Sequence, residues 1–595
     1  MKSFSADPWM RKPKIILGLD IGTTFSGVSF AYLFPEGPQA VMRVNAWPGQ
    51  EAHSGDSKIP TQIWYDKNKK ATAFGAEALS AETQDEAEDS GWSLARHFKL
   101  HLHPKAMKEM HNLTLDPLPE GVPLSTIYRD FFGYLIQHTQ DAFEDCVLDG
   151  TRMWEMLFPS ADVVIAHPNG WGLREQEFMR EAAVAANIVP RSQSRTRIFF
   201  VTEGEASVHY CMFYANLAPQ LKENVKFIVC DAGGSTVDTT TYSVSQVHPR
   251  LQLHEVKPSA CILAGGVFVN IAAEEYFHRV FSNPEANIPP DETRDLVRNA
   301  VDAFEMTVKK AFNDITSKGS LDLGMSRYNN PAVGVKRGRM TLDGTTTGTF
   351  FQPVVNQIVD SLKEQMSGVN CKHILVVGGF GENRFLRETL KKTFGSRDCQ
   401  VVTANDSTSK AVSDGVVIFH AISLVTARAC RFDYGTSKSV LYNPEDPQHS
   451  KRTPHYSNDG KEWTCSVWQP LVRRSNDGVE RPYYRTYEVI SPNLTHFTEA
   501  VFAYTLLNGQ EEPYYVKDAD ENLTPGMERV CVISADLSRL SGALKEHRGV
   551  KGKYWKVEYN IGIKFGGTEL QAYLTWTENG KKCMSEAQII PSSLM

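Results

Sequence analysis

The sequence predicts a two-lobed α/β protein that continues into a β-rich C-terminal region. Two apolar strands, about 200 residues apart, each end in an aspartate followed by glycine and threonine. A third apolar strand ends in a glycine-rich turn before a helix, and helical periodicity fades after about residue 425. A chain of 595 residues is too long for one hydrophobic core, so several compact units are expected.

The first aspartate turn lies in a predicted hairpin near the N-terminus. Residues 15–19 form an aliphatic run that predicts a buried strand, and residues 20–24 then read Asp-Ile-Gly-Thr-Thr. Alternation through Val28, Phe30 and Tyr32 predicts the returning strand.

The same design recurs much later in the chain. Residues 227–230 are apolar, residues 231–236 read Asp-Ala-Gly-Gly-Ser-Thr, and residues 237–244 are rich in threonine and valine. A repeated strand–turn–strand unit indicates two related lobes.

Further strands and helices fit an α/β architecture because they alternate along the chain. The apolar run 373–377 ends in Gly-Gly-Phe-Gly and leads into a helix predicted over 382–394. The other predicted elements are strands at 163–166 and 197–201, helices at 174–187 and 291–314, and C-terminal strands at 555–565 and 570–576 with a turn at 578–580.

An aspartate at the end of a strand, followed by glycines and threonines, is typical of a phosphate site. The carboxylate can hold Mg²⁺, glycine lets backbone N–H groups approach phosphate oxygens, and threonine hydroxyls donate further hydrogen bonds. One such turn alone is more often a tight connection between strands, but the pair predicts a site that holds a triphosphate from two sides. No Walker loop occurs in the sequence.

The motifs resemble those of the heat shock 70 kDa family. Residues 17–24 and 229–238 are similar to its two phosphate motifs, 197–206 to the segment that links its lobes, 263–268 to its next glycine pair, and 376–381 to its adenosine motif. The resemblance covers residues 15 to about 425 and points to the divergent branch typified by heat shock 70 kDa protein 12.

The resemblance implies a duplicated ribonuclease-H-like fold of the actin and hexokinase type. It implies a nucleotide-binding domain at 14–425, preceded by an N-terminal tail at 1–13 and followed by the β-rich domain at 426–595 that the C-terminal strand pattern predicts. Lobe I would span about 14–225 and lobe II about 226–425.

Family roles follow for individual residues. Asp20 and Asp231 would organise Mg²⁺ and the attacking water, Glu203 would orient the water, and Lys99 would reach the γ-phosphate. A solvated helix lysine is the open alternative for Lys99, and an ordinary i, i+4 ion pair is the alternative for Glu305 with Lys309. The nucleotide-binding set is Gly22, Thr23, Thr24, Gly233, Gly234, Ser235, Thr236, Asp238, Gly265, Gly266, Glu305, Lys309, Gly378, Gly379 and Phe380.

Several positions depart from the family pattern. Ser235 stands where the second hairpin of the family has a third glycine, and Val267 and Val269 replace acidic residues. The adenosine loop carries Phe380 and Glu382 where small and basic residues are usual in the family. These departures leave open whether ATP is hydrolysed.

We therefore expect a protein that binds ATP or ADP with Mg²⁺ and acts as a slow ATPase, a conformational switch coupled to a protein client or regulatory partner. A non-hydrolysing nucleotide sensor or scaffold is the alternative. A small-molecule kinase of the same fold is a further one, disfavoured by the β-rich tail and the motif order.

Composition narrows the partners and the compartment. The net charge is −7 without a long basic run, so nucleic acid is not an expected partner. Ten scattered cysteines without a C-x-x-C pair indicate reduced thiols. No signal peptide and no membrane span is expected, which favours the cytoplasm, with the nucleus as the alternative.

Overall fold

The computed structural model contains two compact units. The first comprises Met1–Trp171 with Phe178–Val425, and the second Gly172–Glu177 with Thr426–Met595. The structure describes residues 2–5, 7–51, 57–110, 115–214, 221–248, 251–396, 398–403, 410–474, 483–492, 496–505, 511–564 and 569–592. The expected mixed α/β architecture with several sheets is confirmed.

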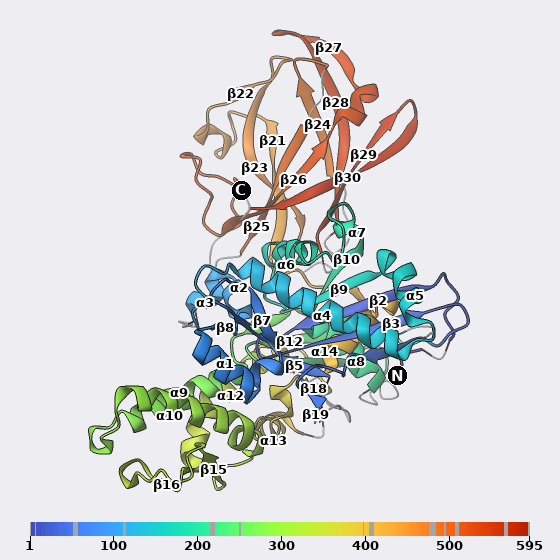
Figure 1. Cartoon of the computed structure of the whole chain (residues 1–595). Coiled ribbons are helices and arrows are strands. Elements are labelled where there is room, and N and C mark those ends of the chain that lie inside the picture. The colour runs from blue at the N-terminus through green and yellow to red at the C-terminus, as the bar shows by residue number, and fades with distance from the viewer. Residues whose placement is uncertain are drawn as a thin grey trace. The chain divides into compact units, whose positions relative to one another are not determined.

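The first predicted hairpin lies inside a seven-stranded sheet (Figure 1). Strands β2 (Lys14–Ile21) and β3 (Phe25–Leu33) pair antiparallel. On its other side β2 pairs in parallel with β9 (Asp162–His167), which pairs in parallel with β10 (Ile198–Thr202). The order is β1-β4-β3-β2-β9-β10, and β5 also pairs with β3; the added strands are β1 (Lys2–Ser3), β4 (Ala40–Arg43) and β5 (Lys58–Pro60).

The second predicted hairpin lies in another seven-stranded sheet of the same local design. Strands β11 (Lys226–Ala232) and β12 (Val237–Gln246) pair antiparallel. β11 then pairs in parallel with β18 (His373–Val377), and β18 with β19 (Gln400–Thr403). Each sheet thus has an antiparallel hairpin next to two parallel strands, so the sequence repeat corresponds to a repeated topology.

Helices α8 (Glu203–Tyr214) and α14 (Ala411–Ile422) pack against each other between these sheets. α14 contacts β2, β3 and β9 of the first sheet, whereas α8 contacts β9 and β10 of the first sheet as well as β11 and β12 of the second. Their backbones approach closely because a Cβ at Gly415 would lie only 1.9 Å from the carbonyl oxygen of Ala206.

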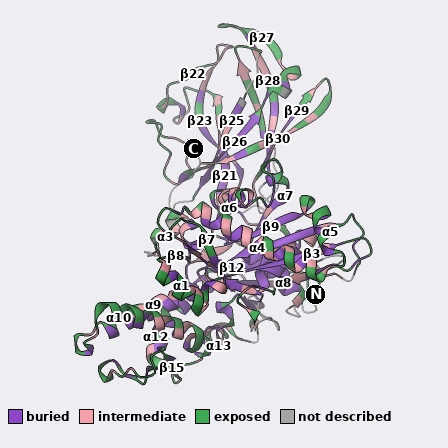
Figure 2. Ribbon diagram, viewed as in Figure 1, coloured by how far each residue is buried: buried purple, intermediate pink, exposed green. Residues whose placement is uncertain are grey.

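Each sheet has its own apolar core. In the first, α4 (Leu124–Cys146) buries Phe131 and Phe132 against the strands. In the second, α9 (Gly266–Phe281) and α12 (Gly344–Met366) contribute to a cluster rich in phenylalanine. Figure 2 shows strands β9 and β12 as buried.

The predicted helix over 291–314 is interrupted by a π-helical turn. It consists of α10 (Pro290–Ala303), the π turn Phe304–Val308 and α11 (Lys309–Ala311), so the prediction of a continuous α-helix to residue 314 is wrong. A π turn accommodates one extra residue, which rotates every following side chain on the helix, and such turns are frequent at functional sites. Helix α13 (Arg384–Phe394) follows β18 as predicted.

Residues near the N-terminus pack on the first sheet. β1 pairs with β4, and Phe4 and Trp9 are buried in a cluster with Ile16 and Val41. Within the described ranges, no helix has both the length and the apolarity needed to cross a membrane.

The second unit contains a ten-stranded sheet whose recorded pairings are antiparallel. In this sheet, a turn connects β29 (Gln571–Glu578) to β30 (Lys581–Pro591). Its Asn579 and Gly580 have φ angles of 49° and 77°, as the predicted Asn-Gly turn requires. The sheet order is β22-β23-β21-β25-β26-β30-β29-β28-β24, with β27 on β28. The strands are β21 (Asp433–Leu441), β22 (His455–Tyr456), β23 (Glu462–Val472), β24 (Tyr483–Val489), β25 (His496–Tyr504), β26 (Met527–Asp536), β27 (Lys545–Gly549), β28 (Gly552–Lys564), β29 (Gln571–Glu578) and β30 (Lys581–Pro591).

Candidate functional site

A cavity of about 510 Å³ lies in the first unit and is lined by both hairpin turns. Sites for small ligands usually fall between roughly 300 and 1,000 Å³. Asp238 and Gly265 are not among the lining residues. The predicted residues that line it are Asp20, Gly22, Thr23, Thr24, Lys99, Glu203, Asp231, Gly233, Gly234, Ser235, Thr236, Gly266, Glu305, Lys309, Gly378, Gly379 and Phe380.

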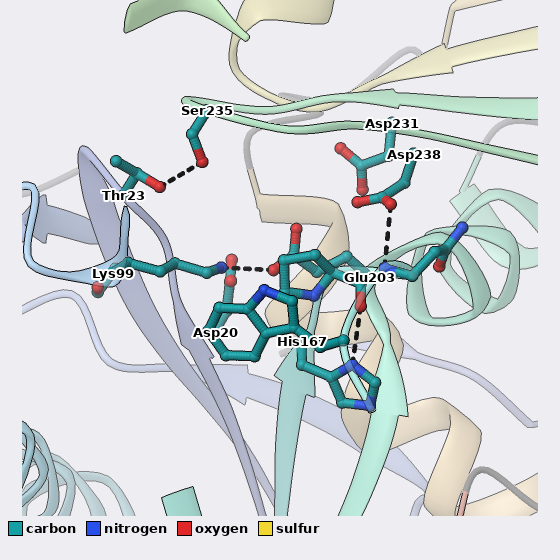
Figure 3. Close-up of polar contacts among 12 residues, drawn as sticks. Asp20, Thr23, Lys99, His167, Glu203, Asp231, Ser235 and Asp238 are labelled. Atoms are coloured by element: carbon teal, nitrogen blue, oxygen red, sulfur yellow. Dashed lines mark hydrogen bonds and ion pairs between the residues drawn. The ribbon is translucent and has the colours of Figure 1, made fainter. Parts of the chain in front are cut away.

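The two turns touch each other at the cavity. The hydroxyl of Thr23 lies 2.6 Å from that of Ser235, and both residues are buried (Figure 3). A Cβ at Gly234 would lie 2.6 Å from Oγ1 of Thr24, so glycine is needed for the hairpins to approach. Gly265 packs against the backbone of the second turn, where a Cβ would lie 2.5 Å from the carbonyl of Gly234.

Asp20 lies one residue before the end of β2 and is held by a lysine outside the recognised motifs. Lys58 on β5 donates from Nζ to Oδ2 of Asp20 at 2.7 Å. Burial lowers the pKa of Lys58, but the carboxylates of Asp20 and Asp231 outweigh burial and raise it overall. Lys58 therefore stays charged in the cavity wall.

Glu203, the first residue of α8, is held by Lys99. Lys99 Nζ donates to Oε1 of Glu203 at 2.6 Å and lies 5.5 Å from the centre of the Trp171 ring. Lys99 is only 3% exposed, so the alternative of a solvated helix lysine is wrong. Burial raises the pKa of Glu203 although Lys99 acts in the opposite direction.

A neutral histidine supports this pair from behind. Trp171 donates from Nε1 to Nδ1 of His103 at 2.8 Å. Burial lowers the pKa of His103 to about 3, and the charge of Lys99 adds to this effect. An uncharged His103 can accept this bond and does not repel Lys99.

Asp231 lies one residue before the end of β11 and has a neutral hydrogen-bond donor. Ser207 on α8 donates to Oδ2 of Asp231 at 2.5 Å. Burial, reinforced by the charge of Glu203, raises the pKa of Asp231 to about 7. Gly378 has φ 86°, and a Cβ there would lie 2.4 Å from Oδ1 of Asp231, so the third glycine-rich turn fits against this carboxylate.

Asp238 lies on β12 behind the cavity lining. Its Oδ1 accepts a hydrogen bond from the backbone N–H of Asn169 at 3.0 Å (Figure 3). Burial and the charge of Glu203 raise its pKa well above the usual range, and a hydrogen bond with Cys261 lowers it in part. Asp238 does not line the cavity, and its contact with a nucleotide stays a prediction.

The π turn and the third glycine-rich turn line the other end of the cavity. Glu305 lies 3.4 Å from Lys309 and accepts a hydrogen bond from Asn270 at 2.5 Å. Burial lowers the pKa of Lys309 more than Glu305 raises it. Phe380 is buried, and a Cβ at Gly266 would lie 3.4 Å from its ring.

The donor set suits a cation that also binds phosphate. In the described part of the chain, no group of three or more His, Cys, Asp or Glu side chains could hold a metal ion without other ligands. Mg²⁺ commonly uses one or two carboxylates and completes its shell with phosphate oxygens and water. Asp20 and Asp231 in the wall of one cavity fit that use.

Four residues that hold the site lie outside the recognised motifs. Lys58, Ser207 and Asn169 reach the carboxylates through tertiary packing, and Trp171 packs against Lys99, the partner of Glu203. For Lys58, the one available signal was a lysine next to a strand that pairs with the first hairpin.

The chain matches no protein-family model. It is 22% identical to human heat shock 70 kDa protein 12B, with 79% of this chain and 78% of that protein covered. It is 20% identical to heat shock 70 kDa protein 12A from human and from mouse, with 94% of this chain and 89% of each relative covered. The predicted resemblance to the divergent heat shock 70 kDa protein 12 branch is thus confirmed across most of the chain.

Proposed function

We propose that this protein binds ATP with Mg²⁺ and hydrolyses it slowly, as a nucleotide-driven switch for a protein client or regulatory partner. The nucleotide-binding domain would be an actin-type, two-lobed fold over residues 14–425, followed by a β-rich domain at 426–595. One observation carries the proposal: two strand–Asp–Gly–Thr hairpins from repeated sheets line one cavity and touch through Thr23 and Ser235.

The turns would bind the phosphates. Backbone N–H groups of glycines point into such turns without a side chain in the way, and threonine hydroxyls add donors. The residues for this role are Gly22, Thr23, Thr24, Gly233, Gly234, Ser235 and Thr236. Asp20 and Asp231 would hold Mg²⁺, which supplies positive charge to the phosphate oxygens during transfer.

Glu203 would orient the attacking water. Its Oε1 accepts the bond from Lys99, which fixes the carboxylate and keeps a cation beside the phosphates. Asp231 lies in the same wall and would accept a hydrogen bond from the water. Positioned charges of this kind are what phosphoryl transfer requires from a protein.

The base would lie at the end of the cavity formed by Gly266, Glu305, Lys309 and Phe380. The ring of Phe380 and the glycine surfaces offer a flat apolar contact for a purine. Lys309 and Glu305 offer a donor and an acceptor for the sugar or the base.

The proposed nucleotide-driven switch depends on ligand contacts from both halves of the nucleotide-binding domain. Ligand contacts come from residues of both halves, 14–225 and 226–425, so a nucleotide stabilises the arrangement in which both turns face the cavity. The linker near residues 425–435 would then differ in protease sensitivity between the free and nucleotide-bound protein. Digestion unchanged by ATP would argue against a switch.

The first test is a single-turnover experiment with purified protein, Mg²⁺ and γ-labelled ATP, following bound nucleotide and released phosphate. Binding with slow phosphate release is expected, and Asp231→Asn should reduce the release rate by about 100-fold or more. The matched control is Asp360→Asn on the exposed face of α12, which should have no effect. Binding without release would identify a nucleotide sensor, and absence of binding would overturn the proposal.

A further inference from the structure

Lys58, Gly27 and Asp20 form one row across three strands. In the register of the first sheet, Asp20 on β2 lies opposite Gly27 on β3, and Gly27 lies opposite Lys58 on β5. Directly opposed residues of antiparallel strands project to the same face of a sheet. The lysine and the aspartate therefore share a face, with a glycine between them.

Gly27 leaves the path open for the lysine side chain. A Cβ at Gly27 would lie 3.1 Å from Cγ of Lys58 and 3.7 Å from its Cε. The lysine stem thus crosses the bare strand backbone and brings Nζ to 2.7 Å from Oδ2 of Asp20. A side chain at position 27 would crowd this route.

The ammonium group belongs to the wall of the cavity. Lys58 lines it together with Thr23 and Thr24, which are the hydroxyl donors of the first turn. Asp20, Asp231 and Glu203 all act on Lys58 electrostatically, so the lysine neutralises a cluster of carboxylates that would otherwise repel phosphate. A lysine has three N–H donors, and the bond to Asp20 uses one of them.

We propose that Lys58 is a built-in cation of the phosphate site, which neutralises Asp20 and contacts the nucleotide phosphates so that nucleotide binding persists without a divalent ion. The inference rests on the proposed nucleotide site and adds a specific property to it. A fixed ammonium beside the first turn supplies part of the positive charge that Mg²⁺ would otherwise supply alone.

The test is calorimetric titration of the full-length protein with ADP, in Mg²⁺ and in EDTA. For the wild type, replacing Mg²⁺ by EDTA should raise Kd by less than about tenfold. For Lys58→Met the same replacement should raise Kd by at least about 100-fold, because Asp20 then keeps its negative charge unpaired beside the first turn. Lys58→Arg should restore the wild-type ratio.

Two further variants separate a charge effect from a structural one. Lys363→Met removes an exposed lysine that pairs with Asp360 at 3.0 Å on α12, and it should keep the wild-type ratio. Gly27→Ala keeps Lys58 but crowds its path, so the ratio should rise in the same direction by a smaller factor. Gly27→Ala also serves as the test variant if Lys58→Met does not fold.

The outcomes distinguish this inference from the proposed function. ADP binding that needs Mg²⁺ strictly in the wild type, or a ratio unchanged in Lys58→Met, would overturn the role of Lys58 and leave the nucleotide site standing. Equal weakening in Mg²⁺ and in EDTA would also overturn it, because a purely structural lysine affects both conditions alike. No binding of ADP in either buffer would overturn both proposals.

Discussion

The two hairpins share a sequence pattern but differ in how their carboxylates are held. In the first half, Asp20 has Lys58 and Glu203 has Lys99 as a charged partner. In the second half, Asp231 accepts from the Ser207 hydroxyl and Asp238 from the Asn169 amide. Among the described residues, no ion pair within 4 Å is recorded for either aspartate of the second half.

Three of these buried carboxyl groups have raised pKa values. Burial raises the pKa of Glu203 despite the charge of Lys99. Burial together with the charge of Glu203 raises the pKa of Asp231 to about 7 and that of Asp238 well above its usual range, and their neutral donors offset this only in part. Asp231 and Asp238 therefore bind protons more readily than ordinary carboxylates, and a bound cation would favour their charged forms. The repeated motif determines where the carboxylates lie, and residues outside it determine their charge.

Removing Lys99 from its buried pair with Glu203 should give the largest effect on stability. Lys99→Met leaves Glu203 buried beside other carboxylates, which should lower the free energy of unfolding by about 3–5 kcal/mol. Urea unfolding of the apo protein measures this change. The exposed control Lys363→Met should show no change.

A second substitution sharpens the result for Lys99. Adding Glu203→Gln removes the stranded charge, so the double variant should recover most of the lost stability. A double variant as unstable as Lys99→Met would mean that packing against Trp171 dominates, and not the ion pair.

The two motif aspartates should respond in opposite directions. Asp20→Asn replaces the charged partner of Lys58 by a neutral amide. The loss of this ion pair should lower the free energy of unfolding by about 2 kcal/mol. Asp231→Asn removes a carboxylate that has only a neutral donor, and asparagine can still accept from Ser207, so stability should stay or rise. Both free energies of unfolding are measured with urea in EDTA without nucleotide. Equal losses of stability in the two variants would contradict the proposed difference between the two hairpins.

Acidification should weaken the first half through His103. Its pKa of about 3 in the folded state lies below the usual value near 6.5, so the unfolded chain takes up the proton first as the pH falls. Stability is complete above about pH 6.5 and is lost toward pH 3, by at most about 1.4 kcal/mol per pH unit.

The variant His103→Gln isolates this contribution, since its amide oxygen can accept the bond from Trp171 without titrating. Between pH 6.5 and pH 5, wild type should lose about 2 kcal/mol more than the variant. Parallel pH dependences of unfolding would show that other groups account for the acid sensitivity.

Local patterns were sufficient to predict the hairpins and the strands beside them. Each strand is a short apolar run that ends at an aspartate or glycine, so β2, β11 and β18 follow from nearest-neighbour sequence. In the predicted helix over 291–314 the apolar residues recur every four positions, a spacing compatible with an α-helix and with a π turn, so only the structure reveals the π turn.

The partners of the carboxylates could not be predicted in the same way. Lys58 reaches Asp20 through strand register over 38 positions, and Ser207 reaches Asp231 through the packing of α8 on β11. Lone lysines and serines are common on any surface, so their type carries no signal until pairing places them. Lys99 differs because a family motif suggested it, yet only burial separated it from a solvated lysine.

The smallest expected effect tests whether the two hairpins act as one unit. The hydroxyls of Thr23 and Ser235 lie 2.6 Å apart and are the direct polar link between the turns that the structure records. A double-mutant cycle with Thr23→Val and Ser235→Ala should give a coupling energy of about 1 kcal/mol in urea unfolding, since each single variant leaves a buried hydroxyl without its partner. The same cycle in ADP affinity should show coupling of the same sign, because the ligand needs both turns in place. Coupling near zero in both measurements would mean that the turns are positioned independently, by their own sheets, and that only the nucleotide joins them.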